Sequence, residues 1–309
     1  MDTLRVGHLS TLYHTSIVIQ AMPEMMEDLS LSMRWRLFGT GPAIVEAFQR
    51  NEIDLAYIGL PPAVIGISRG VDIICVAGGH VEGTVISSHG KAVGYPETDD
   101  LPYILSQFKR IGVPGKGSIH DIIIADLINT HGVKAEILNM AWADEVLEAF
   151  IHGHVDAVVG TPALAEAVIY YGGGRIVYPP HRLWSDNPSY GILVRRRLLK
   201  EYRDHIKEFL LLHERASWLI RNKPVDVAAS VADLLRLVDK KFVLETIRIS
   251  PHYCADITDG YINCTMKLTE RMKSLGYIEG EFKETDIFDL EIIREIHPEP
   301  AHYRDAIKI

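Results

Sequence analysis

The stretch GTGPAIVEAF at residues 39–48 decides the fold, because the chain uses its pattern twice. It continues through EIDLAYIG at 52–59 and PPA at 61–63. About one hundred residues later, at 148–163, the same order returns: Glu-Ala-Phe, then Asp, then Gly, then Pro-Ala. A period this long, used only twice, is typical of two similar lobes and not of a solenoid.

Each copy of the repeat predicts the same elements in the same order. An amphipathic helix leads through a polar turn to a strand, and a glycine turn then leads to a second helix that begins at proline. The first copy places its helix at 43–49 and its strand at 55–58, and the second places them at 145–151 and 157–159. We therefore expect two related α/β lobes.

Short β-branched segments around the repeat alternate with helices, which predicts strands separated by crossover connections. Such connections give sheets that are mainly parallel, with helices on both faces, so the predicted fold class is α/β. We place further strands at 4–8, 34–38, 73–76 and 85–87 in the first lobe, and at 110–113, 136–138 and 176–178 in the second.

The chain after Asn187 is predicted to be one strand followed by helices that pack on the first lobe. The strand is placed at 190–195, and the helices at 202–221, 224–237, 240–246 and 259–275. Two crossings, near Ser88 and Asn187, would form a two-strand hinge. Lobe one then comprises 1–88 plus 188–309, lobe two comprises 89–187, and the ligand cleft lies between them. A length of 309 residues also favours two lobes over one core.

Composition excludes several classes of protein. A formal net charge of −9 disfavours nucleic acid and anionic lipid as partners. The sequence has no apolar run long enough for a spanning helix, and its first ten residues do not resemble a signal peptide, so we expect no membrane insertion. We also expect the protein to act as a monomer.

The three cysteines show no metal-ligand spacing. A disulfide between Cys254 and Cys264 is left open, and Cys75 is interpreted as a buried apolar residue.

Several segments of the sequence resemble one group of ABC-transporter substrate-binding proteins. They are residues 39–63, IGVP at 111–114, Gly117-Ser118 and VDAVV at 155–159. That group takes up aliphatic sulfonates, nitrate, taurine and thiamine-pyrimidine precursors. The resemblance covers about residues 4–280 and leaves the tail from His297 without a counterpart. It implies a type II periplasmic-binding fold whose lobes close on a small solute, a permease as partner, and no cofactor.

Ligands of open α/β sheets bind beyond the carboxyl ends of the strands, where loops lead into helix N-termini. The loops predicted there include 9–15, 39–42, 59–62, 78–82, 115–120 and 160–162, and their backbone N–H groups favour an anionic or carbonyl-bearing solute. The residues expected to bind the ligand are Ser10, Tyr13, His14, Thr40, Gly41, Gly59, Leu60, Gly79, His80, Ser118, Ile119, His120 and Thr161.

Three histidines of these loops, His14, His80 and His120, could hydrogen-bond an anion or heterocycle, or join Glu82 around a metal. The pair His152 and His154 is not expected to bind metal, because the repeat places it at the end of the sheet away from the cleft. No catalytic metal is predicted. Tyr13, Trp142 and Trp184 could stack on a flat solute.

The loop 115–121 lacks the residue order of a phosphate-binding loop, and Ser118 can act simply as a helix cap. No nucleophile-and-base motif is present, so we do not expect an enzyme.

Three functions remain open at this point. The first is a solute-binding protein that delivers a small anionic or heterocyclic molecule to an ABC permease outside the cytoplasm, if a leader has been removed. The second is an enzyme on the same fold, since the sequence also resembles, more distantly, yeast-type thiamine-pyrimidine synthases and menaquinone-pathway enzymes. The synthases carry a cysteine-rich run, and here the nearest match is the isolated Cys254. The third is a cytosolic ligand sensor.

Overall fold

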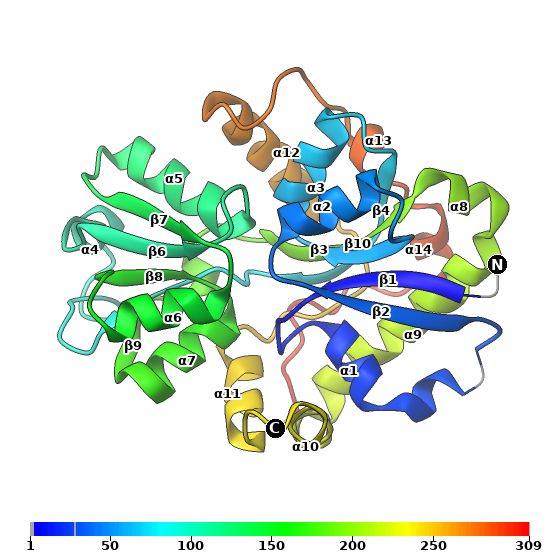
Figure 1. The fold of residues 1–309 in the computed structure, drawn as a ribbon, viewed down its shortest axis with the longest axis horizontal. Coiled ribbons are helices and arrows are strands. Elements are labelled where there is room, and N and C mark those ends of the chain that lie inside the picture. Colours follow the sequence, from blue (N-terminus) through cyan, green and yellow to red (C-terminus); the bar gives the residue numbers. More distant parts are fainter. Residues whose placement is uncertain (1–2, 28, 309) are drawn as a thin grey trace.

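Two α/β lobes lie side by side in the computed structural model, which describes residues 3–27 and 29–308 (Figure 1). Each lobe is built on a five-stranded sheet. The first sheet has the order β2-β1-β3-β10-β4, with β1 at Thr3–Leu9, β2 at Ser32–Phe38, β3 at Leu55–Ile58, β4 at Ile73–Val81 and β10 at Pro188–Arg195. The second has the order β7-β6-β8-β5-β9, with β5 at Val85–His89, β6 at Arg110–Pro114, β7 at Glu136–Met140, β8 at Ala157–Gly160 and β9 at Gly174–Tyr178.

The two sheets have the same plan, which confirms the fold class predicted from the repeat. The first lobe's own strands are β1 to β4, and those of the second are β6 to β9. In both sheets the lobe's second strand lies at one edge, followed by its first and its third. A strand from a crossing comes next, and the lobe's own fourth strand lies at the other edge. The strand from the crossing, β10 in the first sheet and β5 in the second, is antiparallel to both of its neighbours. The parallel pairs β1·β2 and β6·β7 occupy matching places.

Matching helices follow matching strands, as the repeat predicts. The first lobe contains α1 (Thr15–Ala21), α2 (Gly41–Gln49) and α3 (Leu60–Ser68), and the second contains α5 (Ile119–His131), α6 (Ala143–Ile151) and α7 (Pro162–Gly172). The other elements are η1 (Pro23–Met26), α4 (Leu101–Ser106), η2 (Pro180–Arg182), α8 (Arg196–Glu201), α9 (Arg203–Asn222), α10 (Pro224–Leu235), α11 (Lys240–Ile249), α12 (Asp259–Ser274), α13 (Glu284–Ile287) and α14 (Glu291–Ile296). None of the helices in the described part of the chain has both the length and the apolar character to cross a bilayer.

The aspartate of the repeat has the same structural role in both lobes. The Asp54 carboxylate accepts a hydrogen bond from the backbone N–H of Arg5 in β1, at 3.1 Å. The Asp156 carboxylate accepts one from the backbone N–H of Arg110 in β6, at 2.9 Å. Each aspartate thus joins the turn before β3 or β8 to the neighbouring strand, β1 or β6.

Three details of the predicted arrangement are wrong. Residues 85–87 belong to the second sheet, because β5 pairs with β8 and β9, so the chain crosses between Val81 and Val85. The strand predicted at 73–76 continues to Val81, since it pairs along its length with β10. Helix α11 packs on α7 of the second lobe as well as on α10, and does not belong to the first lobe alone (Figure 1).

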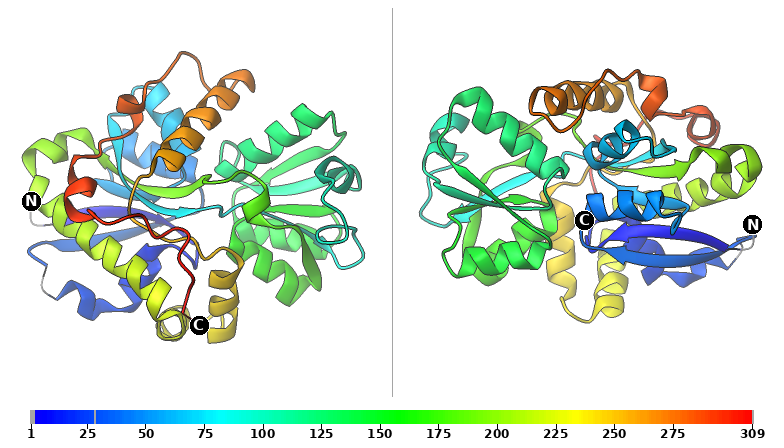
Figure 2. Two further views of the ribbon diagram at one scale, coloured as in Figure 1. Left: turned by 180° about the vertical axis from the view of Figure 1, so that it is seen from behind. Right: turned by 45° about the horizontal axis from the view of Figure 1, so that its top comes forward.

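The end of the chain runs across the back of the first lobe, over α9 (Figure 2). Arg304 in this segment donates to the Glu82 carboxylate at 2.8 Å and to the Asp186 carboxylate at 2.7 Å. Glu82 lies on the first crossing and Asp186 precedes the second, and the backbone N–H of Asp186 donates to Glu82 at 3.1 Å. One guanidinium therefore bridges both connections between the lobes.

We expect Asp54→Ala to lower the free energy of unfolding by about 1 to 2 kcal/mol, because the partly buried donors of Arg5 lose a charged partner while remaining partly accessible to water. Burial disfavours the charge of Asp54, but hydrogen bonds from Arg5 outweigh it and hold the carboxyl pKa below its usual value. Its contribution is therefore present above the usual carboxyl pKa and is lost as pH falls through the lowered value. Urea unfolding near neutral pH measures the loss, with Asp72→Ala as an exposed control; equal effects of the two changes would contradict the assignment.

Candidate functional site

A cavity of about 880 Å³ lies between the lobes. The first lobe contributes the loop from β1 to α1, the start of α2 and Gly59 before α3. The second lobe contributes the starts of α5, α6 and α7, and α10 and α11 contribute apolar side chains at one side. The volume is within the range of sites for small organic molecules.

Three helices of nine or more residues begin at this cavity with the same kind of cap. The hydroxyl of Thr40 accepts the N–H of Ala43 at 3.4 Å at the start of α2. Ser118 at α5 and Thr161 at α7 act in the same way, at 3.2 and 3.1 Å. Other N–H groups of each first turn have no helical acceptor, and the helix dipole adds positive potential there, so this part of the cavity attracts anions and carbonyl oxygens.

His14 lines the cavity and is 1% exposed. Its Nδ1 has no hydrogen-bond partner within the described structure, and its ring packs on Tyr190 with centroids 4.0 Å apart and on Tyr13 at 4.7 Å. Burial, with a smaller effect from neighbouring histidines such as His80, lowers its pKa well below the usual value. The ring is therefore neutral near pH 7 and offers a polar atom, not a charge, to the cavity.

His120, at the start of α5, is the second buried histidine of the cavity wall. Its Nδ1 lies 3.0 Å from the hydroxyl of Thr84, and burial lowers the pKa of the ring to about 4. Thr11 also presents a buried hydroxyl without a partner. Polar groups from both lobes thus meet at the cavity wall.

A large part of the cavity wall is apolar and aromatic. Its residues are Trp35, Leu37, Trp142, Leu147, Tyr171, Leu234, Leu235, Leu237, Val238 and Phe242. Among the described residues that line the cavity, Asp144 is the one acidic side chain and there is no lysine or arginine. A bound molecule therefore meets helix N-termini, neutral polar groups and hydrophobic surface.

Most of the residues predicted to bind the ligand line this cavity. Those at the wall are Ser10, Tyr13, His14, Thr40, Gly41, Gly59, Ser118, Ile119, His120 and Thr161. Leu60, Gly79 and His80 are outside the wall as described. Of the aromatic residues, Tyr13 and Trp142 are at the wall, whereas Trp184 packs on the main hydrophobic core.

His80 departs from expectation because residues 78–81 belong to strand β4 and do not form a loop. Its Nε2 lies 2.7 Å from the carbonyl oxygen of Ser250, which can only accept, so Nε2 carries the proton. Its Nδ1 lies 2.9 Å from the hydroxyl of Ser189. Both ring nitrogens are therefore occupied, and burial lowers the pKa to about 3. His80 supports the cavity residues Ser189 and Tyr13 from behind.

Several wall residues were not predicted. His8 stands near the carboxyl end of β1, so the rule that located the loops could have found it. Ser189 is near the amino end of the antiparallel strand β10, where that rule does not apply. No signal of this kind marks the apolar residues Leu234, Leu235, Leu237, Val238 and Phe242, because their position depends on how α10 and α11 fold back between the lobes.

The cysteines and the remaining histidines lie elsewhere. Cys75, Cys254 and Cys264 are free and buried, so the disulfide left open above does not form in this structure. His152 and His154 are exposed, in the turn after α6. Glu82 is bonded to Arg304 at the crossings and is not part of the cavity wall.

The lobes touch at the rim of the cavity. A Cβ atom added at Gly39 of the first lobe would lie 2.8 Å from the Trp142 ring of the second, and one added at Gly115 would lie 3.0 Å from the Thr40 methyl group. At another side, the ring of Phe242 in α11 lies 5.9 Å from that of Tyr170 in α7. The structure is therefore a closed arrangement of the two lobes.

Solved structures with the same fold include several solute-binding proteins. The alkanesulfonate-binding protein SsuA from Xanthomonas axonopodis pv. citri, bound to MOPS, has a TM-score of 0.77 at 17% identity, covering 91% of this chain and 95% of its own. A ligand-binding component of an ABC-type import system from Staphylococcus aureus, with zinc bound, has a TM-score of 0.79 at 14% identity, covering 97% and 100%. The nitrate-binding protein NrtA from Synechocystis PCC 6803 has a TM-score of 0.77 at 12% identity, covering 100% and 91%.

These likenesses define the fold as that of periplasmic binding proteins. The sequence profile of the NMT1-like family matches residues 1–236, and the chain belongs to that family. Comparison with curated proteins gives no match.

We expect Gly39→Ala to open the lobes, because the added methyl group collides with the indole of Trp142 in the closed arrangement. Small-angle X-ray scattering should give a larger radius of gyration than for the wild type. Gly90→Ala is the matched control, since its nearest neighbour to an added Cβ is at 3.5 Å. A radius unchanged in Gly39→Ala would show that the rim contact does not hold the closed state.

Closure at α7 and α11 should weaken as pH rises. Burial, and to a smaller extent the charge of Glu245, raise the pKa of the Glu166 carboxyl to about 7. A raised folded-state pKa means that the stabilisation is present at low pH and is lost as pH rises through that value. The thermal midpoint of Glu166→Gln should therefore fall less than that of the wild type between about pH 5 and pH 9. Glu148→Gln, on the exposed surface of α6, is the control and should follow the wild type.

Proposed function

We propose that this protein is the solute-binding component of an ABC importer and captures a small organic molecule with one anionic or strongly polar group and an apolar body. The observation that carries the proposal is the composition of the cavity between the lobes, whose wall combines three capped helix N-termini with aromatic and aliphatic side chains.

The polar part of the wall suits a sulfonate, carboxylate or similar group. Helix N-termini bind such anions through backbone N–H groups without a cationic side chain. The described cavity wall has no lysine or arginine, so the charge of the solute would be stabilised by these dipoles and by neutral donors. The unpartnered Nδ1 of His14 is one further polar contact, and a heterocyclic nitrogen could use it equally well.

The apolar part of the wall supports a solute with a hydrocarbon or aromatic body. An inorganic anion as small as nitrate would leave most of about 880 Å³ unfilled. A metal ion as the transported solute is disfavoured as well, because the groups of three or more metal-ligand side chains found among the described residues lie outside this cavity.

Binding without reaction is the simplest use of this site. The free cysteines lie outside the wall as described, and the wall histidines His8, His14 and His120 have lowered pKa values that make them weak bases. The proposal includes delivery to a permease outside the cytoplasm by a monomer. Turnover of the bound molecule would instead support an enzyme on this fold, and binding without a permease would support a cytosolic sensor.

Native mass spectrometry of freshly purified protein would identify a co-purifying solute, and a thermal-shift panel of sulfonates, carboxylates and pyrimidines would test the class. A ligand at about 100 times its dissociation constant adds about 2.7 kcal/mol of stability. If inorganic nitrate stabilises the protein as strongly as organic anions do, the proposal that the solute has an apolar body is wrong.

His14→Ala and His120→Ala should each weaken solute binding about tenfold to a hundredfold, because each removes a polar contact to a charged or polar group. Isothermal titration calorimetry with the identified solute measures the change. His152→Ala and His154→Ala, exposed in the turn after α6, are controls and should bind as the wild type does. Loss of binding in the control variants would place the solute elsewhere.

A further inference from the structure

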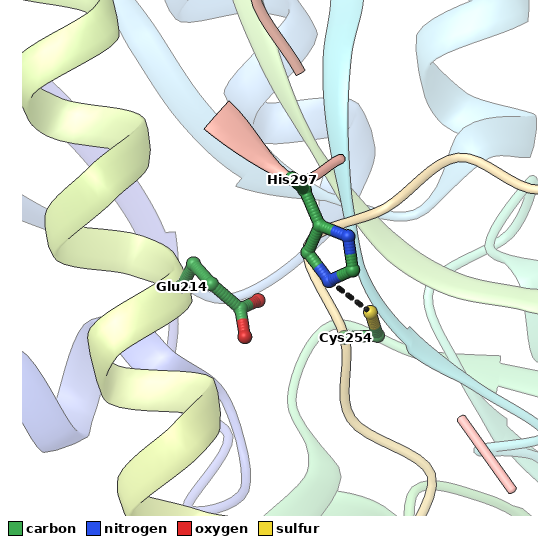
Figure 3. Close-up of side chains that lie close together, drawn as sticks. All are labelled: Glu214, Cys254 and His297. Carbon is green, nitrogen blue, oxygen red and sulfur yellow. Dashed lines mark hydrogen bonds between the residues drawn. The ribbon is translucent and has the colours of Figure 1, made fainter. Parts of the chain in front are cut away.

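A second group of polar side chains lies close together outside the cavity wall (Figure 3). It joins Glu214 of α9, Cys254 in the segment after α11, and His297, which follows α14. Each offers one metal-ligand atom, and these atoms lie within 4.8 Å of one another. Cys254 and His297 are 0% and 4% exposed.

The histidine is held in the form that binds metals. Its Nδ1 lies 3.0 Å from the carbonyl oxygen of Glu299, which can only accept a hydrogen bond, so Nδ1 carries the proton. The lone pair of Nε2 is then directed at the Cys254 sulfur, 3.3 Å away. A hydrogen bond from the other ring nitrogen to a carbonyl is the usual outer support of a metal-binding histidine.

The carboxylate is held in place in the same manner. Glu214 accepts from Arg221 at 2.8 Å through Oε1 and from the N–H of Ala255 at 2.9 Å through Oε2. Each oxygen keeps another lone pair, and hydrogen-bonded carboxylates are common as metal ligands. The three side chains therefore need only small movements to converge.

The spacing fits a zinc-type ion. Bond lengths of about 2.3 Å to sulfur and about 2.0 Å to nitrogen place these two atoms about 3.5 Å apart in a tetrahedral site. The separation of 3.3 Å between Cys254 Sγ and His297 Nε2 is close to this value. A fourth ligand is within reach, since Glu299 Oε1 lies 4.0 Å from the same Nε2.

We propose that Cys254, His297, Glu214 and Glu299 form a structural site for a divalent zinc-type cation, which fastens the C-terminal segment to the first lobe. Binding forms a bond from sulfur to the metal and releases the thiol proton to solvent. With Cys254 as thiolate, the three negative charges of the ligands balance the metal and Arg221.

The position of the site gives it a structural use. The segment that it fastens continues to His302, whose N–H donates to the Cys254 sulfur at 3.3 Å, and then to Arg304, which bridges the two crossings between the lobes. A metal ion here would therefore hold in register the residues that bridge the hinge.

The test uses full-length, tag-free protein, freed of metal by a chelator and titrated with zinc chloride. We expect one zinc per chain by mass spectrometry, a raised thermal midpoint, and, with cobalt chloride instead, the absorbance of a sulfur-to-cobalt charge transfer. Cys254→Ser should abolish that absorbance, and His297→Gln should weaken zinc binding by at least about tenfold. Cys264→Ser, a buried cysteine outside the cluster, is the matched control and should keep both.

Two results would overturn the proposal: a metal-free wild type that stays folded but takes up no zinc, or a charge-transfer absorbance that persists in Cys254→Ser. Circular dichroism shows whether each variant is folded. If Cys254→Ser unfolds, the zinc affinity of His297→Gln is the test instead, and an affinity equal to that of the wild type would overturn the proposal. Thr40→Ala, at the cavity, should retain zinc binding, so failure of the metal site and failure of the proposed solute site can be told apart.

Discussion

The constraint on which the structure depends is that the chain crosses between the lobes twice and each crossing delivers an antiparallel strand into the sheet that it enters. Strand β5 becomes part of the second sheet as soon as the chain arrives, and β10 becomes part of the first sheet on return. Neither sheet is complete without its crossing strand. The lobes are therefore joined through the interiors of their sheets, and a movement of one lobe must bend the segments directly beside β5 and β10.

That arrangement also determines the chemistry of the cavity. The carboxyl ends of the parallel strands in both sheets face each other, so the helices that follow them begin at one shared space. Burial of the His14 and His120 rings lowers their pKa values and keeps them neutral near pH 7. Helix N-termini are also more effective where water is partly excluded. The cavity thus stabilises negative charge by fixed dipoles and leaves the rest of its wall free for hydrophobic contact, a combination that does not depend on a charged side chain.

Much of this was predictable from local pattern. The repeated Asp, Gly and Pro of residues 54–63 and 156–163 carry turn and helix-start chemistry, and that chemistry fixes where strands end and where helices begin at the cleft. His80 was misplaced because Gly78-Gly79 resembles a loop, whereas the glycines there let Tyr190 and the Asp256 carbonyl approach the strand closely. The α10–α11 wall could not be predicted, because its position is set by contacts across about seventy residues of chain and not by periodicity.

The C-terminal segment links these features into one mechanical unit. Arg304 is bonded to Glu82, and Glu82 also accepts the backbone N–H of Asp186, so the two crossings are tied to each other at a single point. Burial disfavours the charge of Glu82, but the hydrogen bond from Arg304 outweighs it and lowers the carboxyl pKa. A rotation of the lobes that separates the crossings would break charged hydrogen bonds of the buried Glu82 carboxylate, whereas a rotation about an axis through this point would keep them. The geometry therefore favours opening about an axis near Arg304.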